Sequence, residues 1–530
     1  MGRKFRSGHG PDEAMLMPAD PREWLPAGHL AWRVLDLAGE MDLAGFGAGY
    51  RADGQGGRPF DPRMMATLLL YCYCRGRRSS REIEAATFDD VGARVICGGL
   101  HPDHSTVAGF VRRNAAAVAA LLPESVKACA AEGLVDLALV AGDGTKLKAN
   151  AAMAANLTRE QLSAQVAELE AWIGQEVREW VQDVLGEKGP APADGDGGPR
   201  GGDGGGKPKW KSRPPRAAQM LERRLAARDA LDAAASRKDR ADCEARAAKL
   251  AARLARSEEA CARREEKVRA RLEARAAREA AGEKVGGRRP LSCPEEDRDL
   301  RELRAFRDKT RAAWEAASRP AATTAGPDAR VNATDPSSGV MPLKKGGYDQ
   351  LHNAQALAVA GSQVILAVTR HPSPADVSAM LPLLAEARRV ARQAGVPGQI
   401  GSALFDAGYA SDANFTAGVP ETLYVAVTRE ARQAGRSADG RDPATALLPS
   451  WQAMADRLAA PGGKALYRKR AGIIEPVFAQ LTARLGRTLH YRGDLADTEL
   501  ALWAASHNLL KAATARTRRL SRQVPALAPA

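Results

Sequence analysis

An abrupt change of composition at residues 157–325 constrains the fold of this chain more than any other feature. The segment is rich in Ala, Arg and Glu and favours helix, whereas apolar runs typical of strands occur on both sides of it. These strand patterns argue against a helical scaffold protein. They predict an α/β domain that is split by a long helical insertion.

The insertion is predicted to contain long helices, notably at 217–283, and a Gly/Pro-rich linker at about 186–215 that we expect to be disordered. The heptad pattern is poorly kept, so coiled-coil and helical-hairpin packing both remain open. The many charges are typical of a solvated face, with DNA contact as the alternative.

Before the insertion, the sequence LVDLALVAGDGTKLKANA predicts the first strands of the α/β domain. An apolar run is followed by Asp143-Gly144 and then by a second alternating run. Asp before Gly is common in tight turns, so we interpret this segment as two strands joined by a turn at Asp143-Gly144. The polar ends of both strands would then meet at Asp143.

After the insertion, the strand pattern returns. Residues 353–371 predict a hairpin that turns at Gly361-Ser362, and residues 401–409 predict an apolar strand that ends at Asp406. A helix at 375–394 separates them, and a further strand is expected at 421–428. Two acidic residues are thus predicted at strand ends.

The first 134 residues predict an all-helical N-terminal domain. The stretch FDPRMMATLLLYCYCRG begins with a helix-start signal and ends at Gly, and Ser79 with Glu82 forms a capping box at the next helix. A later helix carries Arg112 and Arg113. The pattern suggests a helix-turn-helix-like DNA-binding unit, but it is equally typical of a plain helical bundle.

The charge balance favours a polyanionic partner. Lys and Arg number 78 against 64 Asp and Glu, giving a formal net charge of +14. Such an excess is typical of proteins that bind nucleic acid, although a solubility device or a general preference for Arg gives the same number. The seven scattered Cys do not suggest a disulfide framework.

The N-terminus and the apolar runs indicate where in the cell the protein is expected. The N-terminus lacks the apolar core of a signal peptide, and the runs at 64–70 and 364–368 are too short to span a bilayer. We expect a cytoplasmic protein, associated with the nucleoid if it binds DNA, and no membrane partner.

Three carboxylates carry the predicted chemistry. Asp143 and Asp406 lie at polar strand ends, where active sites gather in α/β sheets, and Glu475 lies on the helix GIIEPVFAQLTARLG at the margin of its buried stripe. Carboxylate oxygens are the ligands that hard cations prefer, and two such ions about 4 Å apart can drive phosphodiester cleavage. Taken singly, each residue has a structural alternative: a turn residue, a helix cap and a first-turn dipole partner.

Other candidate sites are weaker. Cys97, His101 and His104 lie close together, but a fourth zinc ligand is missing and the spacing matches no standard site. The sequence contains no phosphate-binding P-loop, so use of ATP is not indicated.

Together these motifs resemble one family. FDPRMMATLLLYCYCRG with the segment that follows it, DGTKLKANA, NATDPSSGVM with GYDQLHNAQ, FDAGYASDANF, and YRKRAGIIEPVFAQL with GDLADTELALWAASHNLLK are similar to bacterial insertion-sequence transposases with a DDE site. The insertion-sequence-1182 group is the most similar. The resemblance covers the chain apart from the Gly-rich and Arg-rich insertion.

The resemblance implies a ribonuclease-H-like catalytic domain and three catalytic, metal-binding residues. In that fold the first Asp lies on the first strand, the second just after the fourth, and the Glu on a late helix, which correspond to Asp143, Asp406 and Glu475. The implied cofactor is Mg²⁺, which Mn²⁺ can replace. The implied reaction is cleavage by activated water at the element end, followed by attack of the freed 3′-hydroxyl on target DNA.

The resemblance also implies DNA contacts near the cut end. Tyr467 and Arg470 match a Tyr and an Arg that the family places shortly before the Glu. The family's Lys seven positions after the Glu is replaced by Thr482, and Arg484 is the candidate substitute; His352 stands where Tyr is usual.

Further candidates for phosphate contact lie near the motifs, although simple surface residues fit equally well. They are Lys146, Lys148, Lys344 and Lys345, besides Arg112 and Arg113 in the N-terminal region.

The predicted domains and partners follow. We expect a helical N-terminal domain at 1–134, a catalytic domain at 135–156 and 326–512, the insertion at 157–325 and a basic tail at 513–530. The partners are the terminal repeats of the element and target DNA, bound by a homodimer or a higher oligomer. A metal nuclease without strand transfer and a catalytically inactive DNA-binding relic are the alternatives.

Overall fold

The computed structural model describes residues 20–50, 59–185, 214–282, 293–317, 329–343, 346–371, 373–428 and 448–523. The chain forms two compact units. The first combines Met1–Met153 with Ser337–Ala530, and the second is Ala154–Pro336, which contains the predicted insertion. Most of the predicted linker, as well as Lys344 and Lys345, lies outside the described residues.

The first unit opens with short helices. They are η1 (Pro21–Glu23), α1 (Leu30–Glu40), η2 (Ala44–Gly47), α2 (Pro62–Cys74), α3 (Ser80–Asp89), α4 (Val91–Cys97), α5 (His104–Arg113), α6 (Ala115–Ala119) and α7 (Leu121–Ala131). The predicted helix starts are confirmed. Asp61 caps α2, and the reciprocal capping box of Ser79 and Glu82 begins α3.

A six-stranded mixed sheet forms the middle of this unit. Its strands are β1 (Leu139–Lys148), β4 (Gly339–Pro342), β5 (Tyr348–Val359), β6 (Ile365–His371), β7 (Ser402–Phe405) and β8 (Thr422–Val425). The order is β4-β5-β1-β7-β8, and β6 pairs with the part of β5 that follows the stretch paired with β4. β1 is antiparallel to β5 and parallel to β7, and β7 is parallel to β8.

The predicted turn at Asp143-Gly144 is wrong, because β1 continues through it. Asp143 pairs with Ala356 in the middle of an unbroken ladder. The neighbouring glycines serve close packing instead of a turn. A Cβ at Gly142 would clash with the ring of Phe405, and one at Gly144 would come within 2.5 Å of Gln355 Nε2.

The elements after the insertion match the predicted order. The hairpin β5–β6 turns at Gly361, whose φ is +79°, and β7 ends immediately before Asp406. The helices that follow β6 are α11 (Met380–Gln393), η5 (Ala407–Tyr409), α12 (Asp412–Phe415), α14 (Pro449–Ala459), α15 (Pro461–Tyr467), α16 (Arg470–Leu485) and α17 (Leu495–Gln523).

The start of the predicted basic tail is helical. α17 continues to Gln523 and so includes the first part of the predicted tail at 513–530. Arg516 bonds Glu40 and Glu132, and Arg519 also bonds Glu132. These ion pairs hold the last turns of α17 against α1 and α7.

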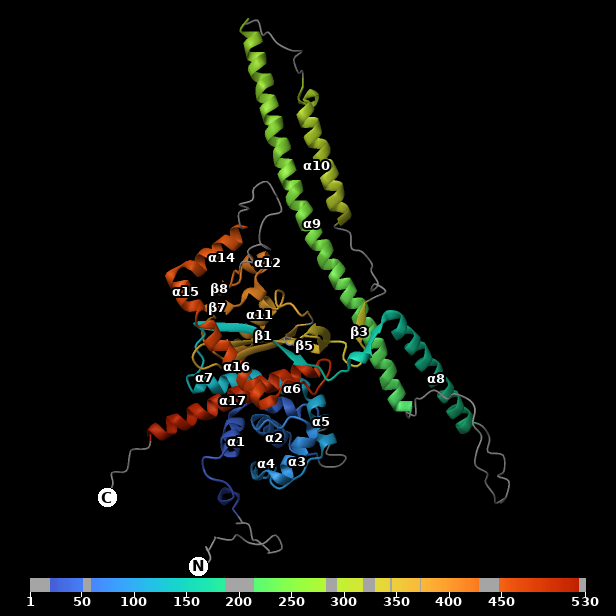
Figure 1. The fold of residues 1–530 in the computed structure, drawn as a ribbon, viewed down its shortest axis with the longest axis vertical. Coiled ribbons are helices and arrows are strands. Elements are labelled where there is room, and N and C mark those ends of the chain that lie inside the picture. The colour runs from blue at the N-terminus through green and yellow to red at the C-terminus, as the bar shows by residue number, and fades with distance from the viewer. Residues whose placement is uncertain are drawn as a thin grey trace, which may run out of the picture. The chain divides into compact units, whose positions relative to one another are not determined.

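α17 lies between the N-terminal helices and the sheet (Figure 1), so both share one hydrophobic core. All residues of α2 from Met65 to Cys74 are buried. Arg78, just after α2, donates to the Thr488 carbonyl at 2.7 Å, lies 3.5 Å from the buried Glu499 carboxylate and stacks over Trp503.

The second unit is largely helical. It contains α8 (Arg159–Leu185), α9 (Pro214–Ala280), η4 (Pro294–Glu296), α10 (Arg298–Ala317) and the paired strands β2 (Asn156–Thr158) and β3 (Arg330–Asn332); η3 (Met153–Ala155) precedes β2. α10 folds back along α9 as a helical hairpin (Figure 1). Arg264 binds Asp297 across this hairpin at 2.8 Å.

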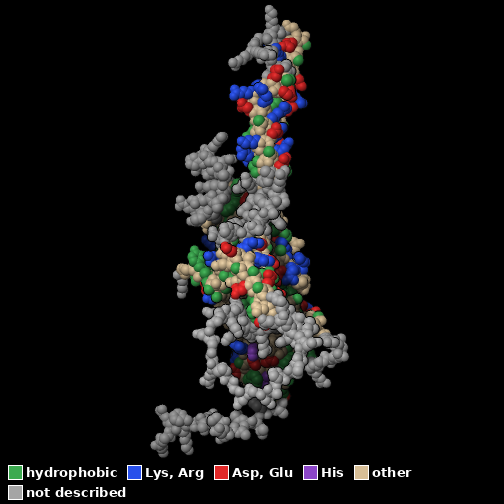
Figure 2. Space-filling view, turned by 90° about the vertical axis from the view of Figure 1, so that its right-hand side faces the viewer, with side chains coloured by type: hydrophobic (Ala, Val, Ile, Leu, Met, Phe, Trp, Pro, Cys, Tyr) green, Lys and Arg blue, Asp and Glu red, His purple; other side chains and the backbone are tan. Residues whose placement is uncertain are grey.

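The surface of the α9–α10 hairpin carries both signs of charge. Figure 2 shows Lys and Arg side chains interspersed with Asp and Glu along it. Several of these charges pair with each other, such as Arg304 with Glu265 and Arg311 with Glu258. The interspersed charges fit the interpretation as a solvated face. None of the helices within the described ranges combines the length and apolarity that a membrane crossing needs.

The tight packing at β1 generates a test. We expect Gly142→Ala to lower the free energy of unfolding by about 1–3 kcal/mol, the usual cost of overpacking, because the new methyl must displace the Phe405 ring. Gly39→Ala is the matched control. It lies within α1 with open space around its Cα, and should raise stability by about 0.5–1 kcal/mol. Urea denaturation of both variants measures the difference, and equal effects would contradict the packing argument.

Candidate active site

The parallel pairing of β1 and β7 brings Asp143 and Asp406 side by side. Ala141 pairs with Leu404, and each Asp lies two residues further along its own strand. Asp143 Oδ1 accepts a hydrogen bond from the Gly144 amide at 2.7 Å, and Asp406 Oδ1 accepts one from the Gly408 amide at 2.9 Å. The two acids therefore meet where β7 ends beside the middle of β1, so only Asp406 lies at a strand end as predicted.

The two carboxylates share an environment that disfavours two negative charges. Burial raises the pKa of the Asp406 carboxyl above its ordinary value, and the neighbouring charge of Asp143 raises this pKa further. A cation placed between them relieves this repulsion. The donor set, two carboxylates partly withdrawn from water, suits a hard divalent ion.

Arg470 supplies the positive charge in this structure. Its Nη1 lies 3.1 Å from Asp143 Oδ2, and the guanidinium also lowers the pKa of Asp406. Tyr467, at the end of α15, bonds Arg470, and burial raises the pKa of the Tyr467 hydroxyl. The structure thus brings Tyr467 and Arg470, both predicted DNA contacts, to the carboxylate pair.

Glu475 does not join this group. Its side chain is exposed, whereas Ile473, Ile474 and Val477 of the same helix are buried. Arg470 lies on the inward side of α16, and five further residues place Glu475 about 140° away around the helix axis. Within the described ranges, no three His, Cys, Asp or Glu side chains are grouped closely enough to hold a metal ion.

Asp376 lies beside the pair, and the sequence analysis did not identify it. Its Oδ1 accepts hydrogen bonds from Asn353 Nδ2 at 2.7 Å and Gln355 Nε2 at 2.8 Å, and its charge contributes to the raised pKa of Asp406. Asp376 lies in an irregular segment between β6 and α11. The run of polar residues in the first part of β5, which includes Asn353 and Gln355, was the available signal.

The Gln355 amide links Asp376 to the buried side chain of Tyr409. Gln355 accepts a hydrogen bond from the Tyr409 hydroxyl, and burial raises the pKa of that hydroxyl strongly. The chain of bonds fixes the position of Asp376 next to the loop that carries Asp406.

The remaining predicted DNA contacts are dispersed. Lys146 donates to the Pro374 carbonyl at 2.7 Å and lies 3.9 Å from Asp376, so it borders the site; burial lowers its pKa. Lys148 is exposed and binds Asp349 at 2.7 Å. Arg112 and Arg113 are exposed in the last turn of α5.

Arg484 and the Cys/His cluster lie elsewhere. Arg484 lines a pocket formed by α16, α17 and the β5–β6 turn, and does not contact the carboxylates. His101 bonds Thr87, His104 bonds Glu84 and Cys97 is buried in the core. These three side chains thus have separate partners.

One comparison with known proteins found a match, in the N-terminal helices. Residues 20–113 match the family model described as Transposase domain (DUF772), a stretch that covers α1 to α5. No curated protein and no solved structure matches the chain. The match supports a transposase family and, in general terms, a DNA-processing enzyme.

The negative charges close to Asp406 predict that replacing it with Asn changes the melting temperature in a pH-dependent way. Because the pKa of Asp406 is raised in the folded state, its protonated form favours folding, and this contribution is lost as the pH rises through that pKa. In EDTA at pH 7, Asp406→Asn should therefore raise the melting temperature, by about 2 °C. The gain should shrink as the pH falls toward the ordinary pKa of Asp.

Asp456→Asn serves as the control, because Asp456 is an exposed residue of α14. This substitution should leave the melting temperature nearly unchanged, at pH 7 as well as near the ordinary pKa of Asp. A lower melting temperature for Asp406→Asn at pH 7 would contradict this prediction. It would show that the hydrogen bond from Gly408 to the Asp406 carboxylate stabilises the fold more than repulsion from Asp143 destabilises it.

Proposed function

We propose that this protein is a DDE transposase of the insertion-sequence-1182 group, which binds the ends of its element and catalyses metal-dependent strand cleavage and strand transfer. The observation that carries the proposal is the adjacent pair Asp143 and Asp406 on neighbouring parallel strands. Its setting, in a chain whose N-terminal helices match a transposase domain, supports the same conclusion.

The strand order supports a ribonuclease-H-like catalytic domain. With the short β4 left aside, the sheet contains β1, β5 and β6 as an antiparallel set, followed across β1 by the parallel β7 and β8. Asp143 then lies on the first strand and Asp406 directly after the fourth. This is the arrangement that the resemblance implies for the first two acids.

Mg²⁺, or Mn²⁺ in its place, fits the donor set, with Asp143 and Asp406 as the first two ligands. Such ions activate an attacking oxygen and stabilise a leaving one. Arg470 bonds Asp143 Oδ2, so the guanidinium has to give up this bond before that oxygen can bind an ion. Released from Asp143, Arg470 is free to bind a DNA phosphate next to the reacting group.

Glu475 is the third ligand that the resemblance implies, and it has to turn toward the pair. Pro476 offers a place for that motion, because it lacks an amide hydrogen and cannot bond the carbonyl of Gly472 within α16. Gln363 Nε2 donates to this carbonyl instead, at 3.3 Å. We infer that the first turns of α16 rearrange when metal and DNA bind, exchanging Arg470 for Glu475.

DNA would approach across the edge of the sheet that carries the pair. Tyr467, Arg470 and Lys146 border the carboxylates, and the exposed Lys148 lies on the same strand as Asp143. Arg112 and Arg113, in the part of the chain that matches the transposase domain, are candidates for binding the terminal repeats. Pairing of two element ends requires at least a dimer, and such a protein would be associated with the nucleoid.

The catalytic proposal is tested by cleavage and joining of labelled DNA that carries the repeats flanking the gene, with Mg²⁺ or Mn²⁺. Wild type should nick and join, and Glu475→Gln should lower both rates at least about a hundredfold, as expected when a group acting on the transition state is removed. Glu273→Gln, an exposed Glu of α9, is the matched control and should be as active as wild type. If wild type binds the ends without cutting them, a DNA-binding relic is the better account.

The exchange at Arg470 has its own test. Arg470→Gln removes the competitor for Asp143, so the variant without DNA should bind Mn²⁺ about tenfold more tightly, as followed by paramagnetic resonance of the free ion. Cleavage should nevertheless fall, because the phosphate contact is lost. Arg468→Gln, an exposed neighbour, should change neither quantity. Unchanged Mn²⁺ affinity in Arg470→Gln would contradict competition between the guanidinium and the ion.

A further inference from the structure

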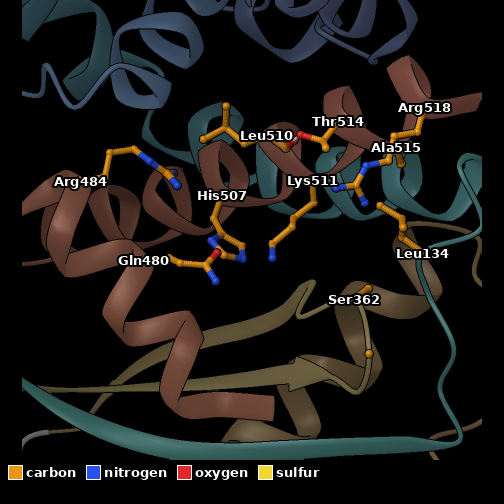
Figure 3. A pocket seen from close by; sticks show the side chains of 11 residues that line it. Leu134, Ser362, Gln480, Arg484, His507, Leu510, Lys511, Thr514, Ala515 and Arg518 are labelled. Atoms are coloured by element: carbon orange, nitrogen blue, oxygen red, sulfur yellow. Dashed lines mark hydrogen bonds between the residues drawn. The ribbon is translucent and has the colours of Figure 1, made fainter. Parts of the chain in front are cut away.

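A pocket lined by Arg484, Lys511 and Arg518 lies away from the carboxylate pair. It has a volume of about 430 Å³ and is lined by Leu134, Gly361, Ser362, Gln480, Arg484, His507, Leu510, Lys511, Thr514, Ala515 and Arg518. Figure 3 shows Lys511 and Arg518 extending from α17 into the space near Ser362, while Arg484 and Gln480 enter from α16. The pocket shares no residue with the proposed active site.

The pocket is positively charged without a balancing acid. Arg484, Lys511 and Arg518 line it, and none of the described residues that line it is Asp or Glu. Burial lowers the pKa of Lys511, and the charge of Arg484 lowers it further. Cations that are partly buried and repel one another are stabilised when an anion binds between them.

Buried polar groups of the pocket also have no hydrogen-bond partner among the described residues. They are Nη1 of Arg484, which is a donor, and Nδ1 of His507, a residue with only 1% of its surface exposed. His507 Nε2 donates to the Gln363 carbonyl, so Nδ1 is an acceptor in the neutral ring and is not a partner for an anion. A buried donor without an acceptor is costly, and native proteins rarely leave one so. An anionic ligand supplies the acceptor that the Arg484 guanidinium lacks.

Gln363 holds Lys511 in place from one side of the pocket. Lys511 Nζ and Gln480 Nε2 both donate to Gln363 Oε1 at 3.1 Å, and His507 Nε2 lies 3.0 Å from the Gln363 carbonyl. Gln363 adopts a left-handed backbone with a φ of +60°, which is unusual for a residue with a side chain. Lys511 has three donors and uses one here, so its others can serve a ligand.

We propose that this pocket binds a phosphate group, held by Lys511, Arg518 and Arg484. The phosphate can belong to a small molecule or to the backbone of DNA, since the same charges and donors suit both. In the second case the pocket is an anchor for DNA separate from the carboxylate pair, and the inference then rests on the proposed function.

Calorimetric titration of the full chain with inorganic phosphate and with pyrophosphate, at constant ionic strength, tests the site. We expect saturable binding to wild type and binding about tenfold weaker to Lys511→Gln and to Arg518→Gln, each of which removes one charged donor. Arg522→Gln removes the same charge from an exposed position of the same helix and should bind like wild type. No saturable binding, or equal weakening in all three variants, overturns the proposal.

A carboxylate introduced by mutation at the pocket tests the site independently, through the melting temperature. Thr514 is exposed on α17 at the rim of the pocket, so Thr514→Glu places an anion among the cations without disturbing the core. It should raise the melting temperature without phosphate and abolish the stabilisation that phosphate gives wild type. Thr514→Gln has the same shape without the charge and should do neither. If Thr514→Glu responds to phosphate as wild type does, the phosphate does not bind here.

Competition identifies the source of the phosphate. If pyrophosphate displaces a short labelled duplex, and Lys511→Gln lowers the salt dependence of duplex binding by about one ion, the ligand is the DNA backbone. If duplex binding responds to neither while phosphate binding is lost in Lys511→Gln, the ligand is a small molecule. Neither assay uses cleavage, so an inactive Asp143→Asn variant should retain phosphate binding even if the catalytic proposal fails.

Discussion

The central position of β1 determines most of the first unit. β1 bonds β5 on one side and β7 on the other, and both partners lie about 200 or more residues further along the chain. The sheet therefore cannot form until the part of the chain that follows the second unit has been synthesised. Closing a long loop costs only slightly more entropy than closing a shorter one, so the insertion of the second unit between β1 and β5 destabilises the sheet little.

The same strand carries one acid of the candidate site. Its parallel pairing with β7 sets Asp143 beside Asp406, and its two glycines let Phe405 and Gln355 approach closely enough to fix the surroundings. Arg470 then balances part of the negative charge of the two half-buried carboxylates. The pocket at the β5–β6 turn has the opposite charge balance, because its lining contains cationic side chains and no acidic one.

Local patterns in the sequence predicted the local structure. The capping box at Ser79, the turn at Gly361 and the strand before Asp406 depend on neighbouring residues, so the sequence alone indicates them. The apparent turn at Asp143 was misinterpreted because glycines that permit close packing look the same as glycines that permit a turn. Their role depends on Phe405 and Gln355, which are distant in sequence.

Features assembled from distant segments were not predictable in this way. Asn353 and Gln355 hold Asp376 in its position near Asp406, and the phosphate pocket combines α16, α17 and a hairpin turn. The orientation of Glu475 depends on which side of α16 is buried. That side could be estimated from apolar spacing, but Ile473 as well as Ile474 faces inward and turns Glu475 away from the sheet.

The burial of α2 on all sides has a consequence for how such a chain can evolve. The segment that matches the transposase domain is packed against α17, and Arg78 reaches Thr488 and Glu499 near the other end of the chain. This segment is therefore not a module that recombination could exchange between related chains without loss of packing. Substitutions are expected at its exposed positions, while the surfaces facing α17 change only in step with it.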